Sequence, residues 1–267
     1  MVSLTLDTPE LAAQYDIVGQ RQFSHGKLLV HDLDIRFGQR VLDLGAGTGL
    51  LAAYVASIVG ATGKVTAVDP LPLRVALASK KAAEVEAKVG RAEDLSDFAA
   101  SSFDVVYLNS VIHWIADKRQ VLAEIQRVLK PGGKLGFTTA AKEKPHDVEL
   151  FRQRALEQTG LQHRAEAAVG IPHKVSSDEV RELFAAGGYR TKQVQIRTIV
   201  DYQQTANDVY TASLASSFGN HLAGLSAQER DEVQRAFGAE LEKQRDAQGI
   251  RLERHLIFAV AEKPQIS

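Results

Sequence analysis

A glycine-rich turn is the feature of this sequence best suited to hold a ligand. Gly45, Gly47 and Gly49 alternate with small residues in the turn. The turn follows an apolar run that ends at Leu44 and leads directly into an amphipathic stretch. Glycine lets the backbone turn tightly and lets a ligand approach the main chain at the start of a helix. A dinucleotide fingerprint would require glycine or alanine three positions after Gly47, where this chain has Leu50, so the turn argues against NAD or FAD.

An acidic residue stands where it could bind the sugar of a nucleotide-like ligand. Asp69 ends the next apolar run, Lys64–Asp69. It follows Gly49 by about 20 residues, the spacing at which a carboxylate accepts hydrogen bonds from a ribose. An aspartate at the end of a strand is also a common turn residue. Its position after the glycine-rich turn favours the ligand interpretation, and the two features together predict an adenosine-type ligand.

Three motifs occur in a fixed order along the chain: LDLGAGTG at Leu42–Gly49, VDP at Val68–Pro70 and LKPGG at Leu129–Gly133. With these motifs the chain resembles the class I methyltransferases that use S-adenosylmethionine (AdoMet). The resemblance implies an α/β fold, namely a Rossmann-like, doubly wound sheet of seven strands, mostly parallel with an antiparallel last strand, plus a helical lid insertion. AdoMet would lie across the carboxyl ends of the first four strands.

The same resemblance implies a set of cofactor contacts. Those around the methionine part of AdoMet would come from Asp43, Gly45, Ala46, Gly47 and Gly49. Asp69 would bind the ribose, and the adenine would lie among Pro70, Leu71, Ala92 and Glu93. Asn109 and Ser110, which close the fourth apolar strand, would face both the cofactor and the methyl acceptor. Glu93 could instead be a solvated loop charge.

An N-terminal segment would cover the bound cofactor. The resemblance implies that Tyr15 packs near AdoMet, that Arg21 meets the AdoMet carboxylate, and that Phe23 contacts the acceptor. Two alternatives stay open: an aromatic anchor in the core for Tyr15, and a surface charge for Arg21.

A His-Trp pair follows the fourth strand, where the transferred methyl group should emerge. A similar pair occurs in trans-aconitate-type methyltransferases, and Trp114, the only tryptophan, would pack against the cofactor or stay in the core. His113 would act as a base if the acceptor arrives protonated, and His221 is the second candidate. An isolated histidine is more often a structural hydrogen-bonding group. Because methyl transfer from a sulfonium is an in-line displacement, no base is obligatory.

A long segment between the last two expected strands exceeds what a hairpin needs. Residues Thr205–Gln248 show helical spacing, and Ser226 with Glu229 forms a capping-box pattern. We expect this segment to be a lid over the acceptor pocket, with acceptor contacts from Tyr202, Tyr210 and Phe218. These aromatic side chains could instead pack the insertion onto the sheet.

The elements that must position these residues follow from hydrophobic patterning. Short β-branched runs alternate with amphipathic stretches, as in parallel strands joined by helical crossovers. Strands are expected at Arg40–Leu44, Lys64–Asp69, about Ala87–Gly90, Phe103–Asn109, Lys134–Thr139, Thr191–Val200 and Leu252–Ala261. The expected regions are an N-terminal helical cap over the cofactor (1–39), the AdoMet-binding core (40–140), a helical connection and sixth strand (141–200), the helical lid (201–249), and the last strand and tail (250–267).

Composition removes several classes of function. The 267 residues include no cysteine, which excludes disulfides, thiolate metal sites, cysteine nucleophiles and methylation of arsenic held on protein thiolates. The formal net charge is -1, so nucleic acid is a poor expected partner. The N-terminus lacks the pattern of a secretory signal, and glycines break the uncharged stretch Leu44–Gly63. We therefore expect a cytoplasmic protein with no membrane partner and no resident metal.

The sequence predicts an AdoMet-dependent methyltransferase that acts on a small molecule at oxygen, nitrogen or sulfur. Two alternatives remain. One is a protein that binds AdoMet without transferring its methyl group. The other is an RNA methyltransferase, which a basic stripe on the lid would favour. Neither the acceptor nor the oligomeric state follows from the sequence.

Overall fold

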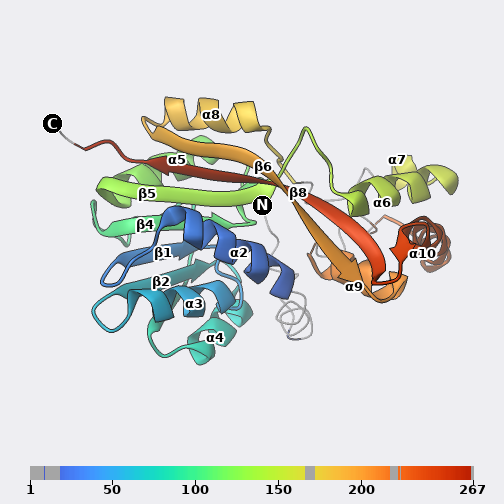
Figure 1. The fold of residues 1–267 in the computed structure, drawn as a ribbon, viewed down its shortest axis with the longest axis horizontal. Helices are drawn as coiled ribbons and strands as arrows, with labels where there is room; N and C mark the ends of the chain where they lie inside the picture. Colours follow the sequence, from blue (N-terminus) through green and yellow to red (C-terminus); the bar gives the residue numbers. More distant parts are fainter. Residues whose placement is uncertain (1–8, 10–18, 166–171, 217–221, 223, 266–267) are drawn as a thin grey trace.

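One mixed sheet organises the protein (Figure 1). The computed structural model describes residues 9, 19–165, 172–216, 222 and 224–265. Its strands are β1 (Arg40–Leu44), β2 (Lys64–Asp69), β3 (Val85–Val89), β4 (Phe103–Asn109), β5 (Leu129–Ala140), β6 (Arg190–Gln203), β7 (Arg245–Asp246) and β8 (Gly249–Glu262). They lie in the order β3-β2-β1-β4-β5-β8-β6, with β7 paired to β8.

The strand directions match the expected fold. Neighbours from β3 to β5 pair in parallel, and β8 pairs antiparallel with β5, β6 and β7. The Rossmann-like, mostly parallel sheet with an antiparallel last strand is thereby confirmed. The expected count of seven strands is wrong, because the described residues form eight. The additional strand, β7, pairs with the start of β8. It has only two residues, which is too short to leave a periodic pattern in the sequence.

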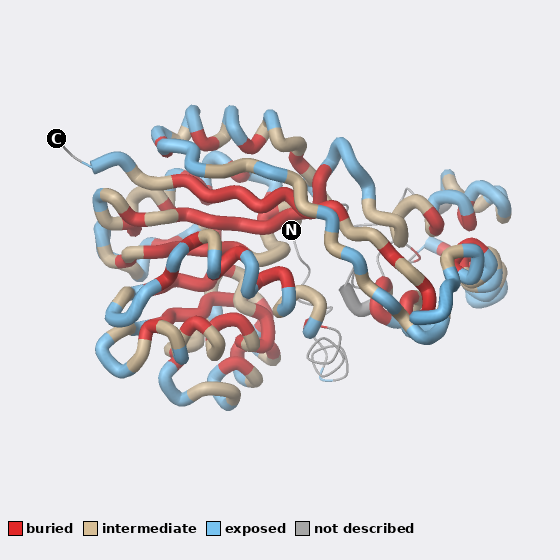
Figure 2. Tube along the Cα trace, viewed as in Figure 1, coloured by how far each residue is buried: buried red, intermediate tan, exposed pale blue. Residues whose placement is uncertain are grey.

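Both faces of the central strands are buried under helices. These helices are α2 (Gln20–Leu33), α3 (Leu50–Val59), α4 (Pro72–Lys81), α5 (Lys118–Val128) and α8 (Ser177–Ala186). Successive side chains of a strand point to opposite faces. Val105 and Tyr107 of β4 accordingly pack on the face of α2 and α3, whereas Val106 and Leu108 pack on the face of α5 and α8. Figure 2 shows the buried residues concentrated along these strands.

A second group of helices lies beyond the end of the sheet, and we term it the helical subdomain. It consists of α6 (Asp147–Gln158), α7 (Gln162–Ala165), α9 (Ala206–Ser216) and α10 (Ala227–Glu242). Strands β6 and β8 run out of the sheet as a two-stranded ribbon that reaches this group, and they stay paired as far as Gln203 and Ile250 (Figure 1). The subdomain has its own apolar core, separate from the two on the sheet faces.

The helical subdomain is assembled from two stretches of chain. Helices α9 and α10 fall within the segment expected as a lid, and the capping box of Ser226 and Glu229 at the start of α10 is confirmed. Helix α6 belongs to the preceding connection, yet its buried Phe151 and Ala155 join the same apolar core as Phe237 of α10. The lid region of the sequence is therefore only part of this body.

Gly136 lies in the middle of β5, where α2 crosses the sheet. A Cβ at Gly136 would lie 2.8 Å from Cδ2 of Leu33, which is fully buried. We expect Gly136→Ala to lower the free energy of unfolding by about 1–3 kcal/mol, the usual cost of overpacking. Urea unfolding followed by circular dichroism measures this change.

Gly238→Ala in α10 is the control for that substitution. A Cβ at Gly238 would lie 3.8 Å from Cβ of Ala206, an ordinary contact. Since alanine is the better helix former by up to about 1 kcal/mol, this variant should be neutral or more stable. Equal destabilisation by the two variants would contradict the packing of α2 on β5.

Candidate active site

A cavity of about 300 Å³ lies between the carboxyl ends of the parallel strands and the helical subdomain. One wall, the glycine side, contains Gly45, Asp69, Pro70, Leu71, Gly90, Arg91, Ala92, Glu93, Ser110 and Val111. We term the second wall the helical side. Its charged residues and histidines are Arg21, His25, His146, Glu149, Arg152, Lys174 and Arg254. The short helix η2 (Ile112–Trp114) also contributes to the lining. Open α/β sheets bind their ligands at this carboxyl edge.

The glycine turn has a backbone that other residues would strain. Gly45, Gly47 and Gly49 all have positive φ, with a φ of 77° at Gly45. A Cβ at Gly45 would lie 2.4 Å from Cγ2 of Val111, and a Cβ at Gly49 would lie 2.8 Å from Cβ of Ala78. The turn therefore needs glycine at both positions, and Gly45 presents bare backbone to the cavity.

Asp69 joins the ends of β1 and β2. Its buried carboxylate accepts a hydrogen bond from the N–H of Gly47 at Oδ2 (2.8 Å) and one from the N–H of Leu71 at Oδ1 (3.0 Å). The parallel pairing of β1 with β2 brings the carboxylate beside the turn. A carboxylate has about four acceptor sites. Because Asp69 also lines the cavity, a ligand hydroxyl can reach it.

Asp43 lies on β1 just before the turn and is not part of the cavity lining. It is buried and accepts a hydrogen bond from the hydroxyl of Tyr107 at 2.7 Å. Burial raises the pKa of Asp43 to about 7; the Tyr107 hydrogen bond opposes this shift and the nearby charge of Asp69 adds to it. The side chain of Asp43 thus joins β1 to β4 next to the turn. Ala46, Gly47 and Gly49, expected as contacts of the same ligand part, are likewise absent from the lining.

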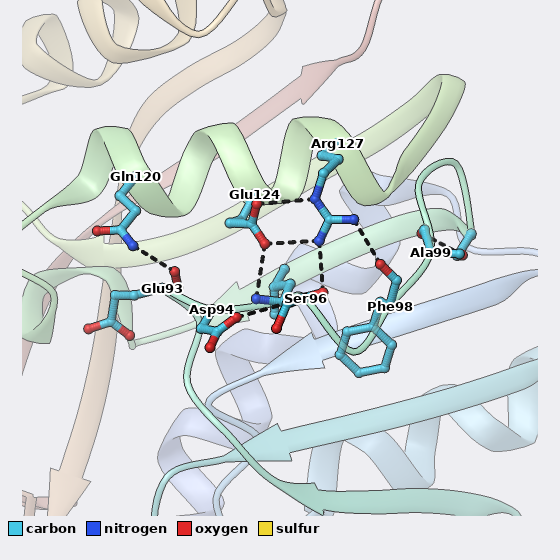
Figure 3. Close-up of polar contacts among 10 residues, drawn as sticks. Glu93, Asp94, Ser96, Phe98, Ala99, Gln120, Glu124 and Arg127 are labelled. Carbon is cyan, nitrogen blue, oxygen red and sulfur yellow. Dashed lines mark hydrogen bonds and ion pairs between the residues drawn. The ribbon is translucent and has the colours of Figure 1, made fainter.

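Helix α5 fixes the loop that follows β3 (Figure 3). Arg127 donates to the carbonyl of Leu95 at 2.8 Å, and Glu124 accepts from the N–H of Leu95 at 3.0 Å. Gln120 donates to the carbonyl of Glu93 at 2.9 Å. The part of this loop that lines the cavity is therefore held by hydrogen bonds within the protein, which preorganises it for a ligand.

On the helical side, charged groups pair incompletely. Lys174 pairs with Glu149, and Nε of Arg254 donates to Asp201. Nη1 of Arg254 donates to Nδ1 of His25 at 3.1 Å. Nη2 of Arg254 is buried and finds no acceptor among the described residues. An unsatisfied buried donor in a cavity wall indicates a place for an acceptor atom of a ligand.

Two histidines of this wall have fixed tautomers. Because a guanidinium can only donate, Nδ1 of His25 is an acceptor, and its Nε2 carries the proton that is donated to Oγ of Ser110 at 2.9 Å. The N–H of His255 donates to Nδ1 of His146 at 2.9 Å, so His146 also carries its proton on Nε2. Burial lowers the pKa of His25 to about 3 and the pKa of His146 to about 4. Both rings are therefore neutral donors at physiological pH.

His113 and Trp114 both line the cavity, with ring centroids 5.0 Å apart. Nδ1 of His113 lies 3.1 Å from Oγ1 of Thr139. Burial lowers the pKa of His113 to about 3, which makes the ring a weak base at neutral pH. A role as general base would therefore require an acceptor whose proton is already acidic.

Phe23, which was expected to contact the acceptor, does not line the cavity. Its ring packs edge-to-face on Tyr54 of α3, with 5.9 Å between ring centroids. With 3.6 residues per turn, Phe23 lies about 200° round α2 from Arg21. Arg21 lines the cavity, so Phe23 on the opposite face of the helix packs toward α3.

Other expected contacts also turn away from the cavity. Tyr210 packs against Phe237, with 6.5 Å between ring centroids, while its neighbour Val209 lines the cavity. Tyr202 is exposed on β6, at the ribbon. Nδ2 of Asn109 donates to the carbonyl of Gln22 at 2.9 Å and ties β4 to α2. Outside the described residues lie Tyr15, Phe218 and His221.

Several lining residues were missed by the sequence analysis: His146, Glu149, Arg152, Lys174 and Arg254. One of them left a usable signal, since Arg254 belongs to the polar stretch Glu253–His255 that interrupts the expected strand Leu252–Ala261. A charged residue in a buried strand often marks a binding site. The others come from α6, from His146 just before it and from the segment ahead of α8, where no motif or strict periodicity marks a site.

Among the described helices, none has the length and apolar character that crossing a membrane would require. Within the same residues, no three histidine, aspartate or glutamate side chains are arranged to hold a metal ion.

Comparison with known proteins relates this geometry to a family. Residues 42–137 match the family model of a methyltransferase domain. The chain is 35% identical over 159 residues to an arsenite methyltransferase of Aquipseudomonas alcaligenes. This alignment covers 55% of this chain and 45% of the relative. It is also 36% identical over 137 residues to the ubiquinone/menaquinone biosynthesis C-methyltransferase UbiE of Psychromonas ingrahamii. That alignment covers 47% of this chain and 54% of the relative. The chain thus spans about half the length of these curated relatives.

A solved structure shares the fold over nearly the whole chain. Phosphoethanolamine N-methyltransferase 2 of Haemonchus contortus, in complex with S-adenosyl-L-methionine, superposes with a TM-score of 0.58 at 20% identity. The superposition covers 99% of this chain and 61% of that one. At this level of identity the likeness is one of fold.

Acid should destabilise the protein through its buried neutral histidines. The pKa of His25 is about 3 in the folded protein and about 6.5 in an unfolded chain, so the unfolded chain binds the extra proton and stability falls as the pH drops below about 6.5. The contribution of Asp43 to stability has the opposite pH dependence. Because its pKa is raised to about 7 in the folded protein, that contribution is lost as the pH rises through this value. We expect His25→Gln to flatten the pH dependence of the free energy of unfolding by up to about 1.4 kcal/mol per pH unit between about pH 6.5 and 4.5.

Urea unfolding of the parent protein and of His25→Gln across this pH range measures the effect. The variant should be less stable at neutral pH, because it loses the hydrogen bonds to Ser110 and Arg254. Parallel slopes for the two proteins would contradict a neutral His25.

Proposed function

We propose that the protein uses the methyltransferase domain matched at residues 42–137 to move the methyl group of AdoMet to a small-molecule acceptor. The observation that carries the proposal is the position of Asp69, a buried carboxylate in the cavity wall that the N–H of Gly47 holds in place. A carboxylate at the end of the second strand can accept hydrogen bonds from the ribose hydroxyls. Leu50 stands where a dinucleotide fingerprint would need a small residue, which disfavours NAD.

The residues around the glycine turn fit AdoMet. Gln22 lines the cavity, and its Oε1 is buried and finds no donor among the described residues. The ammonium of the AdoMet amino-acid end would supply that donor, and Arg21 beside it would meet the carboxylate. Pro70 and Leu71 offer an apolar surface to the adenine at the other end. Both ends of the cofactor therefore have partners of the right chemistry.

Bound AdoMet supplies an electrophilic methyl group on a sulfonium. The task of the protein is to align the acceptor and to keep water out. Ser110 is suited to alignment, because its backbone is held in place. Its φ is an unusual 61°, and its N–H donates a hydrogen bond to Oγ1 of Thr138 at 3.0 Å. Since His25 donates to Oγ of Ser110, the serine hydroxyl keeps its own proton to donate. We assign to Ser110 the orientation of the acceptor.

The described residues of the wall offer no strong base. His25 and His146 use Nδ1 as an acceptor and carry their proton on Nε2. The lowered pKa of His113 makes it a weak base. We therefore propose direct attack by an acceptor lone pair, with His113 taking a proton only from an acidic acceptor. The second candidate base, His221, lies outside the described residues and stays a prediction.

The acceptor would bind on the helical side, under α9. Val209, Ala212 and Ser213 of α9 line the cavity, so the helical insertion supplies part of the acceptor wall. A cavity of about 300 Å³ suits a small molecule better than a nucleic acid. Oxygen, nitrogen and sulfur acceptors all fit this scheme. Arsenite fits poorly, because the sequence has no cysteine to hold it.

Calorimetric titration with AdoMet, S-adenosylhomocysteine and NAD tests the cofactor assignment. We expect the first two to bind with a Kd of about a micromolar or below, and NAD not to bind. Asp69→Asn should weaken AdoMet binding about 10- to 100-fold, because it removes the charge and one acceptor oxygen. Release of S-adenosylhomocysteine in the presence of candidate acceptors then tests methyl transfer itself.

Asp231→Asn, an exposed position on α10, is the matched control and should bind AdoMet like the parent protein. Unchanged AdoMet affinity in Asp69→Asn would show that Asp69 does not hold the ribose. Tight binding of NAD would overturn the cofactor assignment as a whole.

A further inference from the structure

The helical side of the cavity has an excess of positive charge. Arg21, Arg152, Lys174 and Arg254 line it, whereas Glu149 is the one carboxylate that lines it among the described residues. The whole chain, by contrast, has a formal net charge of -1. The excess of cations is therefore a local property of this wall.

Two of the four cations are paired, and one of these two keeps a free donor. Lys174 pairs with Glu149, and Arg254 pairs with Asp201. Even so, Nη2 of Arg254 is buried with no acceptor in the described part of the chain. A buried donor without a partner is destabilising, so a ligand oxygen at this point would satisfy it.

Arg152 lacks a neutralising contact. It lines the cavity from α6 and forms no hydrogen bond or ion pair with a described residue. Burial lowers the pKa of Arg152, and the charge of Glu149 offsets this only in part. Arg154 on the same helix instead lies 3.7 Å from Glu240 of α10. A partly buried guanidinium that forms no ion pair with a carboxylate is unfavourable unless a ligand brings the anion.

The methyl donor makes this electrostatic preference stronger. The sulfonium of AdoMet is a cation, and it would lie between the glycine turn and the helical side. A cationic acceptor such as an ammonium would be repelled by both the sulfonium and the arginines. An anionic acceptor is attracted by both.

We propose that the methyl acceptor is a small oxyacid whose carboxylate or phosphate group binds Arg152 and Arg254 on the helical side, with Arg152 as its main partner. This inference rests on the proposed methyl transfer and adds the chemical class of its substrate. Guanidinium groups suit the role, because they present paired N–H donors to two oxygens of one oxyanion. His146, with its proton on Nε2, adds a neutral donor to the same wall.

Calorimetric titration of the whole protein, saturated with S-adenosylhomocysteine, tests this proposal. The probes are acetate, succinate, benzoate and inorganic phosphate, with succinamide as an uncharged comparison. We expect at least one oxyanion to bind, and its Kd to rise about 10- to 100-fold in Arg152→Gln, as for the loss of a charge-assisted hydrogen bond. Arg154→Gln, two residues further along α6 and outside the cavity lining, should leave that Kd unchanged.

Two further measurements make the test independent of how well one variant folds. Raising NaCl from about 50 to 300 mM should weaken oxyanion binding to the parent protein, because screening reduces the attraction. Arg152→Lys keeps the charge and loses the forked geometry, so it should bind the oxyanion more tightly than Arg152→Gln does.

The outcomes separate this inference from the proposed function. Binding of carboxylates alone, or of phosphate alone, identifies the acid group. The proposal is overturned if no probe binds, if succinamide binds as tightly as succinate, or if Arg152→Gln and Arg154→Gln lose equal affinity. A failure of the cofactor assignment is distinct, because S-adenosylhomocysteine would then not bind while the oxyanion still did.

Discussion

The carboxylate of Asp69 ties together the parts of the cavity that belong to different strands. It ends β2, yet it accepts a hydrogen bond from Gly47 in the turn after β1 and another from Leu71 at the start of the next helical segment. A buried carboxylate is stable only when such donors surround it. The turn must therefore bring its N–H groups inward, which requires the positive φ values that glycine tolerates. The shape of the glycine side follows from this one buried charge.

A second series of hydrogen bonds joins distant elements around the cavity. Arg254 on β8 donates to His25 on α2, and His25 donates to Ser110 at the end of β4. Three elements that are distant in sequence are thereby locked to one another, and the tautomer of the histidine is decided by the arginine. The long ribbon of β6 and β8 makes this possible, since it carries Arg254 and its partner Asp201 past the edge of the sheet.

Local patterns predicted the sheet well and the lining of the helical side poorly. The bounds of β1, β2 and β4 were predicted to the residue, because each is an apolar run buried on both faces and closed by a turn. Acceptor contacts were expected from aromatic residues such as Phe23 and Tyr210, which pack against apolar cores of the protein instead. Arg152 and Lys174, which line the helical side, were overlooked because no short-range spacing marks them.

The sequence by itself determined the core of the fold and the glycine turn that follows β1, because strand periodicity and glycine conformation act over a few residues. Only the tertiary structure decided which side chains face the cavity. That choice depends on how α2, α6 and α9 are rotated about their axes by packing, and a rotation of one residue, about 100°, exchanges a lining residue for a buried one. Burial and neighbouring charges also set the protonation of His25, His113 and His146, and both arise from contacts between distant segments.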